Sequence, residues 1–483
     1  RGLVGSEMCI RDRNQLVPCD YDVEICGLSA DSREIRPGFL FGSLNESQYL
    51  ESAINNGAVA VIVPENDDTA VKAGIAAIPA ANPNLLFARA AAKFYGGQPE
   101  HICAITGTNG KTSIADFIRQ ILTMMGKKAA SMGTLGLIKG TEAPIPSPNT
   151  TPNAVTVQRE LSELKNEGYE YVAMEMSSHG LAQYRVGGVK VNVAGFTNLT
   201  RDHLDYHKTF ENYLAAKMIL FTELLEEGGA AVLNADIEVY NQLKENCLRC
   251  GKRVISYGYN GKDIKLLKAT PQTHGQQLNI IYYGKELELD IPLAGEFQAM
   301  NILCALGMTA EITGNKDEVV KYVTKIRGAK GRLELVGTMP NGAAVYVDYA
   351  HTPDALENVI KALRPHTAGK LHVVFGCGGD RDAGKRPIMG KLANDLADET
   401  IVTDDNPRTE DAAGIRAQIM AACPKGKEIG DRAEAIKQAM QALNKGDVLI
   451  VAGKGHETGQ YINGKIYHFS DQEEILKNLN AGF

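Results

Sequence analysis

The sequence lacks a run of about 18 consecutive apolar residues, the length that a helix needs to cross a bilayer. It also lacks an excess of basic residues, because 51 Lys and Arg stand against 58 Asp and Glu, for a formal net charge of -7. These absences exclude a helical membrane span and leave no basic surface for nucleic acid or anionic lipid. We therefore expect a soluble protein whose partners are small molecules, with no nucleic acid and no membrane among them.

Cysteine is scarce, with nine in 483 residues, an odd number without the spacing of a disulfide framework. The one close pair, Cys247 and Cys250, has no second pair with which to bind zinc. We interpret the cysteines as incidental and expect a reducing, cytoplasmic location. The sequence also lacks an initiator methionine, and Arg1–Arg13 has no apolar core of a secretory signal. We expect that stretch to be non-native adapter sequence and leave it out of the fold.

Length predicts about three domains, and the alternation of apolar runs with helical patterns predicts an α/β fold class. Residues 1–98 read as a small α/β domain that ends at the Gly/Pro break after Tyr95. Residues 99–328 contain apolar runs starting at Ile102, Tyr171, Val191 and Gly229, which predict a parallel sheet. Within them, the alternating segment Gln276–Leu293 predicts a hairpin.

A third domain is expected over residues 329–483. Four apolar runs, AVYVDYA, LHVVFGCGG, ETIVTDD and DVLIVAGKG, are separated by helical patterns and predict a Rossmann-like, doubly wound sheet. No internal repeat or low-complexity tract interrupts them.

The most informative segment is ICAITGTNGKTS, Ile102–Ser113, in which an apolar strand, a Gly-rich turn and a helix follow one another. Such a turn presents backbone N–H groups and a helix N-terminus to phosphate. The cradle would consist of Gly107, Thr108, Asn109 and Gly110, with Lys111 on the β and γ phosphates and Thr112 on magnesium. Ile105 stands where the strict P-loop has glycine, so the motif is a shortened variant, and a plain glycine turn before a helix is the alternative.

Taken with later strings, TGTNGKT resembles the Mur ligase and folylpolyglutamate synthetase superfamily of ATP-dependent amide-bond-forming enzymes. The other matching strings are EMSSHGL from Glu175, FTNLTRDHLDYH from Phe196, YLAAK ending at Lys217, GEFQAMN from Gly295, GRLE from Gly331 and DYAHTPDAL from Asp348. The resemblance covers the chain after residue 15. It implies a uridine-binding N-terminal domain, a P-loop ATPase-like central domain and an amino-acid-binding C-terminal domain.

Three C-terminal strings resemble one branch of the Mur ligases: GCGGDRDAGKRP from Gly376, DNPRTE from Asp405 and GKGHETGQ from Gly453. This branch adds meso-2,6-diaminopimelate to UDP-N-acetylmuramoyl-L-alanyl-D-glutamate in peptidoglycan synthesis, and hence in cell-wall biogenesis, cell shape and cell division. Folylpolyglutamate synthetases lack these strings. The lysine-adding ligases, a P-loop kinase and a non-catalytic nucleotide-sugar-binding relative remain as alternatives.

The resemblance assigns catalytic and metal-binding roles. The catalytic set is Lys111, Glu175, His203 and Lys217. One Mg²⁺ would take Thr112 and Glu175, and a second would take His203 and a carbamate on Lys217, because an anionic oxygen suits Mg²⁺ far better than an ammonium does. From periodicity alone, Lys217 would be an exposed helical lysine. His203 and His207 have the i, i+4 spacing of a zinc site, but Leu204 stands where a zinc protease has glutamate.

The resemblance also assigns substrate contacts. For ATP they are the phosphate loop and Asn301, Arg332, Asp348 and His351. For the UDP-muramoyl-dipeptide they are Ser32, Asn149, Thr150, Thr151, Ser177, Gln183 and Arg185. For diaminopimelate they are Arg381, Asp405, Asn406, Pro407, Arg408, Gly453 and Glu457. Each of three assignments has an alternative without a binding role: a Pro-limited turn at DYAHTP, an Asx-Pro turn at DNPR and a surface arginine at Arg185.

Two further expectations concern the N-terminal domain and the assembly. Relatives carry an Asp-Gly-His stretch after the strand that matches FLFGSL, whereas SLNESQYLES follows here, so part of a uridine-side loop is missing. We expect the protein to be a monomer.

Overall fold

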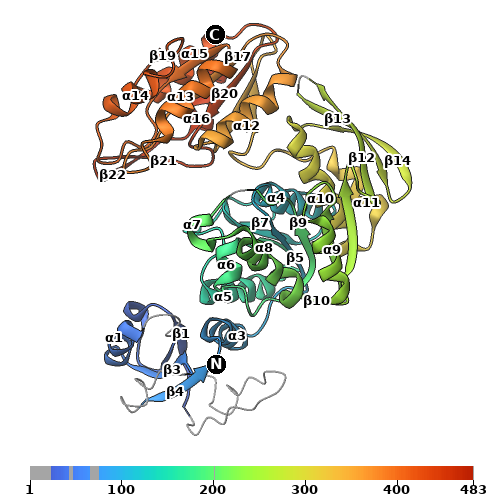
Figure 1. Cartoon of the computed structure of the whole chain (residues 1–483), viewed down its shortest axis with the longest axis vertical. Coiled ribbons are helices and arrows are strands. Elements are labelled where there is room, and N and C mark those ends of the chain that lie inside the picture. The colour runs from blue at the N-terminus through green and yellow to red at the C-terminus, as the bar shows by residue number, and fades with distance from the viewer. Residues whose placement is uncertain (1–22, 43–46, 66–74, 201, 273, 482–483) are drawn as a thin grey trace. The chain divides into compact units, whose positions relative to one another are not determined.

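The computed structural model describes residues 23–42, 47–65, 75–200, 202–272 and 274–481 (Figure 1). The predicted adapter stretch Arg1–Arg13 and the start of the shortened uridine-side loop lie outside them. The chain forms two compact units, one reaching Ile255 and including Gly307–Asn315, the other comprising Ser256–Leu306 and the chain from Lys316. This division differs from the predicted boundaries near residues 98 and 328, which stay a proposal. Among the described residues, no helix combines the length and apolarity of a membrane span.

The N-terminal part of the first unit is a four-stranded parallel sheet with helices packed on it, which confirms the predicted α/β class; its strand order was not predicted. Helix α3 packs on Leu28, Leu40 and Ile62, and helix α1 packs on the alternate residues Phe41 and Val61. Because successive strand residues point to opposite faces, the two helices cover opposite faces of the sheet. The elements are β1 (Gly27–Ser29), β2 (Phe39–Gly42), β3 (Ala58–Pro64), β4 (Ala76–Ala80), α1 (Leu50–Asn55) and α3 (Pro83–Tyr95), with short 3-10 turns at Ser32–Glu34 and Ser47–Tyr49.

The rest of the first unit contains a sheet in the order β10-β9-β5-β8-β6-β7, parallel except for the β6–β7 hairpin. Its strands are β5 (His101–Thr106), β6 (Ala129–Gly133), β7 (Gly136–Lys139), β8 (Tyr171–Glu175), β9 (Val191–Phe196) and β10 (Leu225–Asn234). Its helices are α4 (Lys111–Met124), α5 (Ala154–Asn166), α6 (Ser178–Ala182), α7 (Leu204–His207), α8 (Phe210–Ile219) and α9 (Tyr240–Arg249), with a π-turn at Leu220–Leu224. The predicted parallel sheet is confirmed.

Strand β5 lies between β9 and β8. The next strands of the chain, β6 to β8, lie on one side of β5, and the following strands, β9 and β10, lie on its other side. The loops after these parallel strands meet at their carboxyl ends, which is where ligands bind in open α/β sheets.

The second unit begins with an antiparallel ribbon. The predicted hairpin is confirmed as β13 and β14, which turn at Tyr283 and Gly284. Strand β12 was not predicted; it pairs with β13, but exposed Leu267 interrupts its apolar–polar alternation. The elements are β11 (Arg253–Gly258), β12 (Ile264–Gln272), β13 (Gly275–Tyr282), β14 (Lys285–Ile291), α10 (Glu296–Thr313) and α11 (Lys316–Val323).

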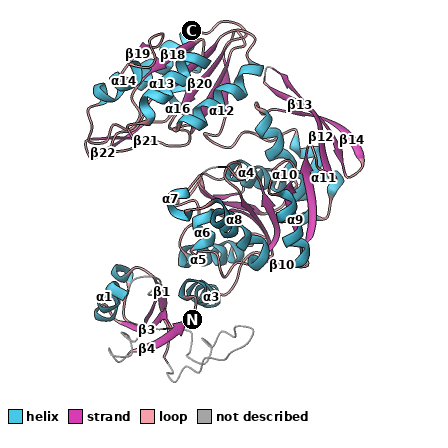
Figure 2. Cartoon of the chain, in the orientation of Figure 1, coloured by secondary structure: helices cyan, strands magenta, loops and turns pink. Residues whose placement is uncertain are grey.

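The C-terminal sheet has the order β15-β16-β20-β17-β18-β19 and is parallel except for β15. The four predicted strands are β16 (Ala344–Asp348), β17 (Leu371–Phe375), β18 (Glu399–Val402) and β20 (Val448–Ala452); the edge strands are β15 (Glu334–Thr338) and β19 (Lys427–Glu428). In Figure 2 these strands lie between helices. One face packs on α12 (Pro353–Leu363), α13 (Lys385–Leu396) and α14 (Ala412–Met420), the other on α15 (Arg432–Gln441) and α16 (Asp471–Ala481). A 3-10 turn follows α12 at Arg364–His366, and a two-stranded hairpin, β21 (Gly459–Ile462) and β22 (Lys465–His468), precedes α16.

Candidate active site

The predicted phosphate loop connects β5 to α4. Gly107 and Gly110 have φ values of 144° and 88°, which side-chain-bearing residues rarely adopt. A Cβ at Gly107 would lie 1.9 Å from Thr197 Oγ1, so glycine is required there. The loop is fastened to the segment after β9, because Asn109 N donates to Asn198 Oδ1 at 2.9 Å and Thr108 N donates to Asn198 O at 3.0 Å.

Two lysine side chains converge on this loop. Lys111 Nζ donates to the carbonyl oxygens of Gly107 and Thr108 at 3.0 and 2.8 Å. Lys217 Nζ, from α8, donates to the same Gly107 oxygen at 2.8 Å. Two amines from different helices thus meet at one carbonyl oxygen of the loop that would bind phosphate.

Lys217 is only 1% exposed, contrary to what helical periodicity alone suggests. Burial lowers the pKa of Lys217 well below its usual value, and the charge of Lys111 lowers it further. The amine lies 4.4 Å from the ring centre of Tyr213, one helical turn earlier. Tyr213 is itself held by a 3.2 Å hydrogen bond between its hydroxyl and Thr108 Oγ1. The site therefore favours a neutral amine at Lys217.

Glu175 ends β8, beside the N-terminus of α4. Thr112 Oγ1 donates to Glu175 Oε2 at 3.0 Å, and Thr134 donates to Glu175 through its backbone N at 2.8 Å and its hydroxyl at 3.2 Å. A Cβ at Gly133 would lie 2.1 Å from Glu175 Oε1, so a glycine admits this carboxylate. Thr134 was not predicted, because it belongs to no recognisable motif.

His203 begins α7 with φ 52°, and its Nε2 lies 3.4 Å from Asp202 Oδ2. Its ring centre is 4.8 Å from that of His179 and 6.3 Å from that of Tyr213, which places it on the same aromatic cluster as Lys217. Burial lowers the pKa values of His179 and His207. Among the described residues, no group of three or more His, Cys, Asp or Glu side chains has the arrangement of a metal site.

The residues predicted for the muramoyl-peptide fall into one connected group in the first unit. Thr151 Oγ1 donates to the Glu175 carbonyl at 3.2 Å and accepts from Ser177 N at 3.0 Å. Arg185 donates to the Thr151 carbonyl and to Gln183 Oε1, each at 2.9 Å. The group thus adjoins the backbone of Glu175 at the end of β8, and Arg185 is half-buried rather than a surface arginine.

Three other predicted residues of this set remain. Asn149 and Thr150 directly precede Thr151 in the chain, and Ser32 lies in the N-terminal sheet domain. Thr150 Oγ1 is 2.9 Å from Thr134 Oγ1, which brings it to the same cluster. Asn149 is exposed. Ser32 is buried, and its carbonyl accepts from Asn56 Nδ2 at 2.9 Å, while the neighbouring Asp31 and Arg33 form an ion pair at 2.6 Å.

The predicted nucleotide contacts of the second unit surround the end of β16. Asp348 accepts from Leu333 N and Ala350 N at 2.6 and 2.8 Å, and burial raises its pKa to about 6. The Arg332 guanidinium lies 4.8 Å from the ring centre of Tyr349. His351 Nδ1 is 2.8 Å from the Tyr349 carbonyl, and burial lowers the pKa of His351.

Asn301 joins this group through Gln298. Asn301 Nδ2 donates to Gln298 Oε1 at 2.9 Å, and Gln298 Nε2 donates to the Arg332 carbonyl at 3.4 Å. Gln298 is fully buried, so it orients Asn301 rather than contacting a ligand.

The predicted amino-acid site lies at the carboxyl ends of β17, β18 and β20. The loops after β17 and β18 are fastened together, because Gly379 N donates to the Asn406 carbonyl at 2.9 Å and Arg408 Nη1 donates to the Gly379 carbonyl at 2.7 Å. Arg408 has φ 53° and donates through its backbone N to the Tyr461 carbonyl at 2.9 Å. Arg381, two residues after Gly379, is exposed.

The loop after β20 completes this site. Gly453 has φ 117°, and a Cβ there would lie 2.9 Å from Asp405 Oδ2. Asn406 Nδ2 donates to Glu457 Oε2 at 3.0 Å. Asp405 and Pro407 are buried, and burial raises the pKa of Asp405 while Arg432 and Lys454 oppose that shift. The structure therefore brings together Asn406, Gly453 and Glu457, and places Asp405 behind them.

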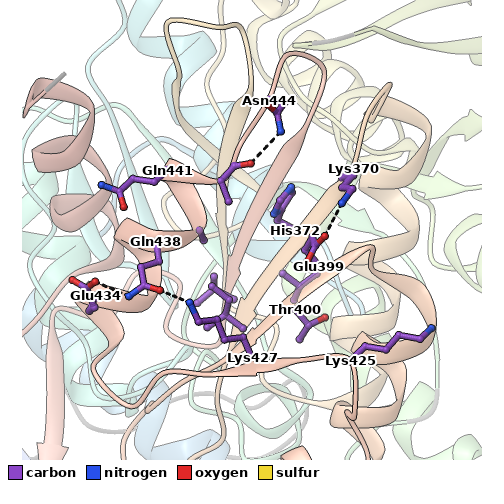
Figure 3. Close-up of a pocket in the computed structure, with 15 residues that line it drawn as sticks. Lys370, His372, Glu399, Thr400, Lys425, Lys427, Glu434, Gln438, Gln441 and Asn444 are labelled. Atoms are coloured by element: carbon purple, nitrogen blue, oxygen red, sulfur yellow. Dashed lines mark hydrogen bonds and ion pairs between the residues drawn. The ribbon is translucent and has the colours of Figure 1, made fainter. Parts of the chain in front are cut away.

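A separate cleft of about 610 Å³ lies over the opposite ends of β17 and β18, beside α15 (Figure 3). Lys370 and Glu399 form an ion pair at 2.7 Å, and Gln438 Oε1 accepts from Lys427 at 2.5 Å. This cleft contains no residue predicted to be functional. Its polar groups are largely satisfied by one another.

The chain is similar to known proteins over nearly its whole length. Residues 105–309 match the Mur ligase middle domain, and residues 331–455 match the Mur ligase glutamate ligase domain. The chain is 46% identical to the UDP-N-acetylmuramoyl-L-alanyl-D-glutamate–2,6-diaminopimelate ligase of Caulobacter vibrioides, over 96% of this chain and 97% of that protein. The enzyme of the same name from Agrobacterium fabrum is 47% identical, over 95% of this chain and 94% of its own.

A solved structure of a UDP-N-acetylmuramoyl-L-alanyl-D-glutamate–2,6-diaminopimelate ligase is also similar. It has a TM-score of 0.73 and 33% identity, covering 100% of this chain and 99% of that one. The likeness therefore extends over the N-terminal sheet as well as the two matched domains.

Proposed function

The chain belongs to the Mur ligase family, and we propose that it joins meso-2,6-diaminopimelate to UDP-N-acetylmuramoyl-L-alanyl-D-glutamate with ATP. The observation that carries this proposal is the convergence of Lys111 and Lys217 on the Gly107 carbonyl, next to the oxygen pair of Thr112 and Glu175. A phosphate loop with the Lys111 cation on one side and paired oxygens on the other suits the transfer of a phosphoryl group. The identity of the amine rests on the relatives and on the loops around Arg408.

The reaction has two chemical steps. A carboxylate oxygen of the nucleotide-linked dipeptide attacks the γ-phosphorus of ATP, and ADP leaves with the electrons of the broken P–O bond. The amino nitrogen of diaminopimelate then attacks the acyl carbon, loses a proton, and expels inorganic phosphate. Carboxylates do not lose oxygen to amines directly at neutral pH, so phosphorylation supplies the leaving group. The protein contributes alignment and electrostatic stabilisation.

Lys111 would bind the β and γ phosphates, while the N–H groups of the loop Gly107–Gly110 hold the phosphate oxygens. At the other end of ATP, Asn301 would approach the adenine, and Arg332, Asp348 and His351 would contact ribose and phosphate. Support for these roles comes from their grouping at the end of β16 and around Tyr349.

Thr112 and Glu175 are suited to holding Mg²⁺. Both supply oxygen atoms, the ligands that Mg²⁺ prefers, and these oxygens lie side by side at the phosphate loop. When bound, Mg²⁺ neutralises charge on the transferred phosphoryl group. Glu175 is fixed from its other side by Thr134, so its carboxylate is already oriented.

A second Mg²⁺ would be held by His203 and by Lys217 after carbamylation. The reason is chemical: only a neutral amine adds CO₂, and burial, assisted by the charge of Lys111, lowers the pKa of Lys217 and favours its neutral form. Addition forms an N–C bond and releases one proton, leaving an anionic carbamate oxygen. Such an oxygen beside Lys111 would also relieve the repulsion between the two amines.

The two remaining substrates would meet this centre from different parts of the chain. Thr150, Thr151, Ser177, Gln183 and Arg185 would bind the dipeptide, with Arg185 on a carboxylate; Asn149 would assist, and Ser32 would contact the uridine. Arg381 and Arg408 would bind carboxylates of diaminopimelate, with Asn406, Pro407 and Gly453 forming the polar wall, Asp405 behind it, and Glu457 taking the distal ammonium. Closure of the C-terminal domain would bring these groups to the acyl phosphate.

We further propose that the enzyme is a cytoplasmic monomer that acts in peptidoglycan precursor synthesis, and so in cell shape and division. The similarity to diaminopimelate ligases supports the role in precursor synthesis.

The test is a coupled assay of ADP release. ATP, Mg²⁺ and UDP-muramoyl-dipeptide are kept constant while the amine is diaminopimelate, lysine or none. We expect rapid release with diaminopimelate, release lower by a factor on the order of 10³ with lysine, and almost none without amine. Equal rates with lysine would instead identify the lysine-adding ligase, and release without amine would indicate a kinase.

A further inference from the structure

Lys454 is a fully buried lysine in the loop after β20, and it binds no substrate in the proposed reaction. Its ammonium donates to the Gly459 carbonyl at 2.6 Å, to Asn406 Oδ1 at 3.2 Å and to Glu457 Oε2 at 3.5 Å. An ammonium has three hydrogens, so these acceptors use all of its donors. Lys454 therefore acts on its neighbours and has no donor left for a substrate.

Glu457 is the neighbour with an exposed side. Its Oε2 accepts from both Asn406 Nδ2, at 3.0 Å, and Lys454. Within the described part of the chain, its Oε1 forms no hydrogen bond, and the side chain is 32% exposed. One oxygen is thus held by the protein and the other is open to a ligand.

The charges around Lys454 favour the same arrangement. Asp405 Oδ1 lies 3.9 Å from the ammonium, so Lys454 stands between two carboxylates, those of Asp405 and Glu457. Without this cation the two anions would repel one another, and the Glu457 carboxylate would move towards solvent. This displacement would weaken its hold on an ammonium.

We propose that Lys454 is a positioning residue that fixes the carboxylate of Glu457, and thereby sets selectivity for an amine substrate with a second charged end. This inference rests on the proposed function. Because Asn406 Oδ1 also accepts from Tyr461 N at 3.1 Å, Lys454 orients the Asn406 amide together with the β21–β22 hairpin. A carboxylate that is already oriented binds its ligand without an additional loss of rotamer freedom.

The test is a double-mutant cycle with Lys454→Met, Glu457→Gln and the double variant, measured by ADP release. Lys454→Met is expected to raise the KM for diaminopimelate about 10- to 100-fold with kcat changed less than about threefold, and to leave the preference for diaminopimelate over lysine little changed, because both amines carry the distal ammonium that Glu457 would bind. In the Glu457→Gln background, the same change is expected to raise KM less than about twofold. Lys454→Arg should recover part of the loss, and Lys425→Met, at an exposed lysine, is the control.

Effects that multiply in the double variant, or an unchanged KM in a folded Lys454→Met, would overturn the role. Circular dichroism and ATP binding establish whether each variant is folded. If Lys454→Met does not fold, the cycle is run with Lys454→Gln, which keeps a donor for the Gly459 carbonyl. Failure of both to fold also counts against the proposal, because Lys454 would then serve the fold. A wild-type enzyme that ignores diaminopimelate defeats the proposed function itself, which is a separate outcome.

Discussion

Lys111 and Lys217 donate hydrogen bonds to one oxygen, the carbonyl of Gly107, at 3.0 and 2.8 Å, although they belong to helices α4 and α8. Two ammonium groups this close repel one another, and only Lys217 is fully buried. The arrangement is most stable when Lys217 is uncharged or converted into an anion. The two lysines are therefore expected to have different chemical roles, which separate variants can test.

Replacement of Lys111 by alanine is expected to abolish ATP turnover while the protein stays folded, because Lys111 would contact the ligand. The loss should correspond to about 3 kcal/mol or more of transition-state stabilisation. Steady-state ADP release measures it, and circular dichroism checks the fold. Lys127→Ala, at an exposed lysine just beyond α4, is the matched control. Near-normal turnover in folded Lys111→Ala would remove the nucleotide assignment.

Replacement of Lys217 by alanine is also expected to abolish activity, but for another reason. If Lys217 must add CO₂, removal of bicarbonate should lower wild-type activity, and its return should restore it, with little change in stability. Incubation with ¹³C-labelled bicarbonate should give a carbamate signal by NMR that Lys217→Ala lacks. An unmodified Lys217 amine in the nucleotide-bound, fully active enzyme would refute the carbamate.

Replacement of Arg408 by alanine is expected to shrink discrimination between amines. Diaminopimelate carries one carboxylate more than lysine, and an arginine left without its carboxylate is costly, so the parent should prefer diaminopimelate by a factor on the order of 10³. Values of kcat/KM for both amines measure the ratio. Arg364→Ala, which removes an exposed arginine paired with Asp398, should leave it unchanged. An unchanged ratio in Arg408→Ala would contradict the assignment.

The buried carboxyl of Asp348 is expected to make stability depend on pH in an unusual direction. Burial raises its pKa from 3.8 to about 6, so between these values the folded protein binds more protons than the unfolded chain. Its contribution is therefore present below about pH 4 and is lost as pH rises through 6. Relative to Asp348→Asn, the wild type should lose up to about 3 kcal/mol of unfolding free energy from pH 4 to pH 7.

Urea unfolding of both proteins across this range gives the difference. The hydrogen bonds that asparagine loses to Leu333 N or Ala350 N shift the whole curve by a constant and leave the trend unaffected. Asp395→Asn, at an exposed residue, is the control. A difference that stays flat or rises with pH would contradict the assigned pKa.

The sequence by itself determined the local features. The phosphate loop can be recognised in the sequence because Gly107, Gly110, Lys111 and Thr112 fall within six residues. The backbone of the loop requires glycine at the two positions with positive φ. The strands of the parallel sheets can be predicted from the sequence because both faces of these sheets are covered by helices, so the strands are continuously apolar. The strings DNPRTE and GKGHETGQ predicted the two loops that the proposed diaminopimelate site would use.

Tertiary structure alone decided which distant residues meet. Helical periodicity suggests an exposed Lys217, but α8 packs against the phosphate loop, so a residue 110 positions from Gly107 is buried against it. In the same way, Thr112 meets Glu175 because β5 and β8 are neighbours in the sheet, not in the chain. Lys454 lies within a recognised string, but its lack of any donor for a ligand follows only from the contacts it makes. Burial and pairing are properties of packed elements, and no local pattern records them.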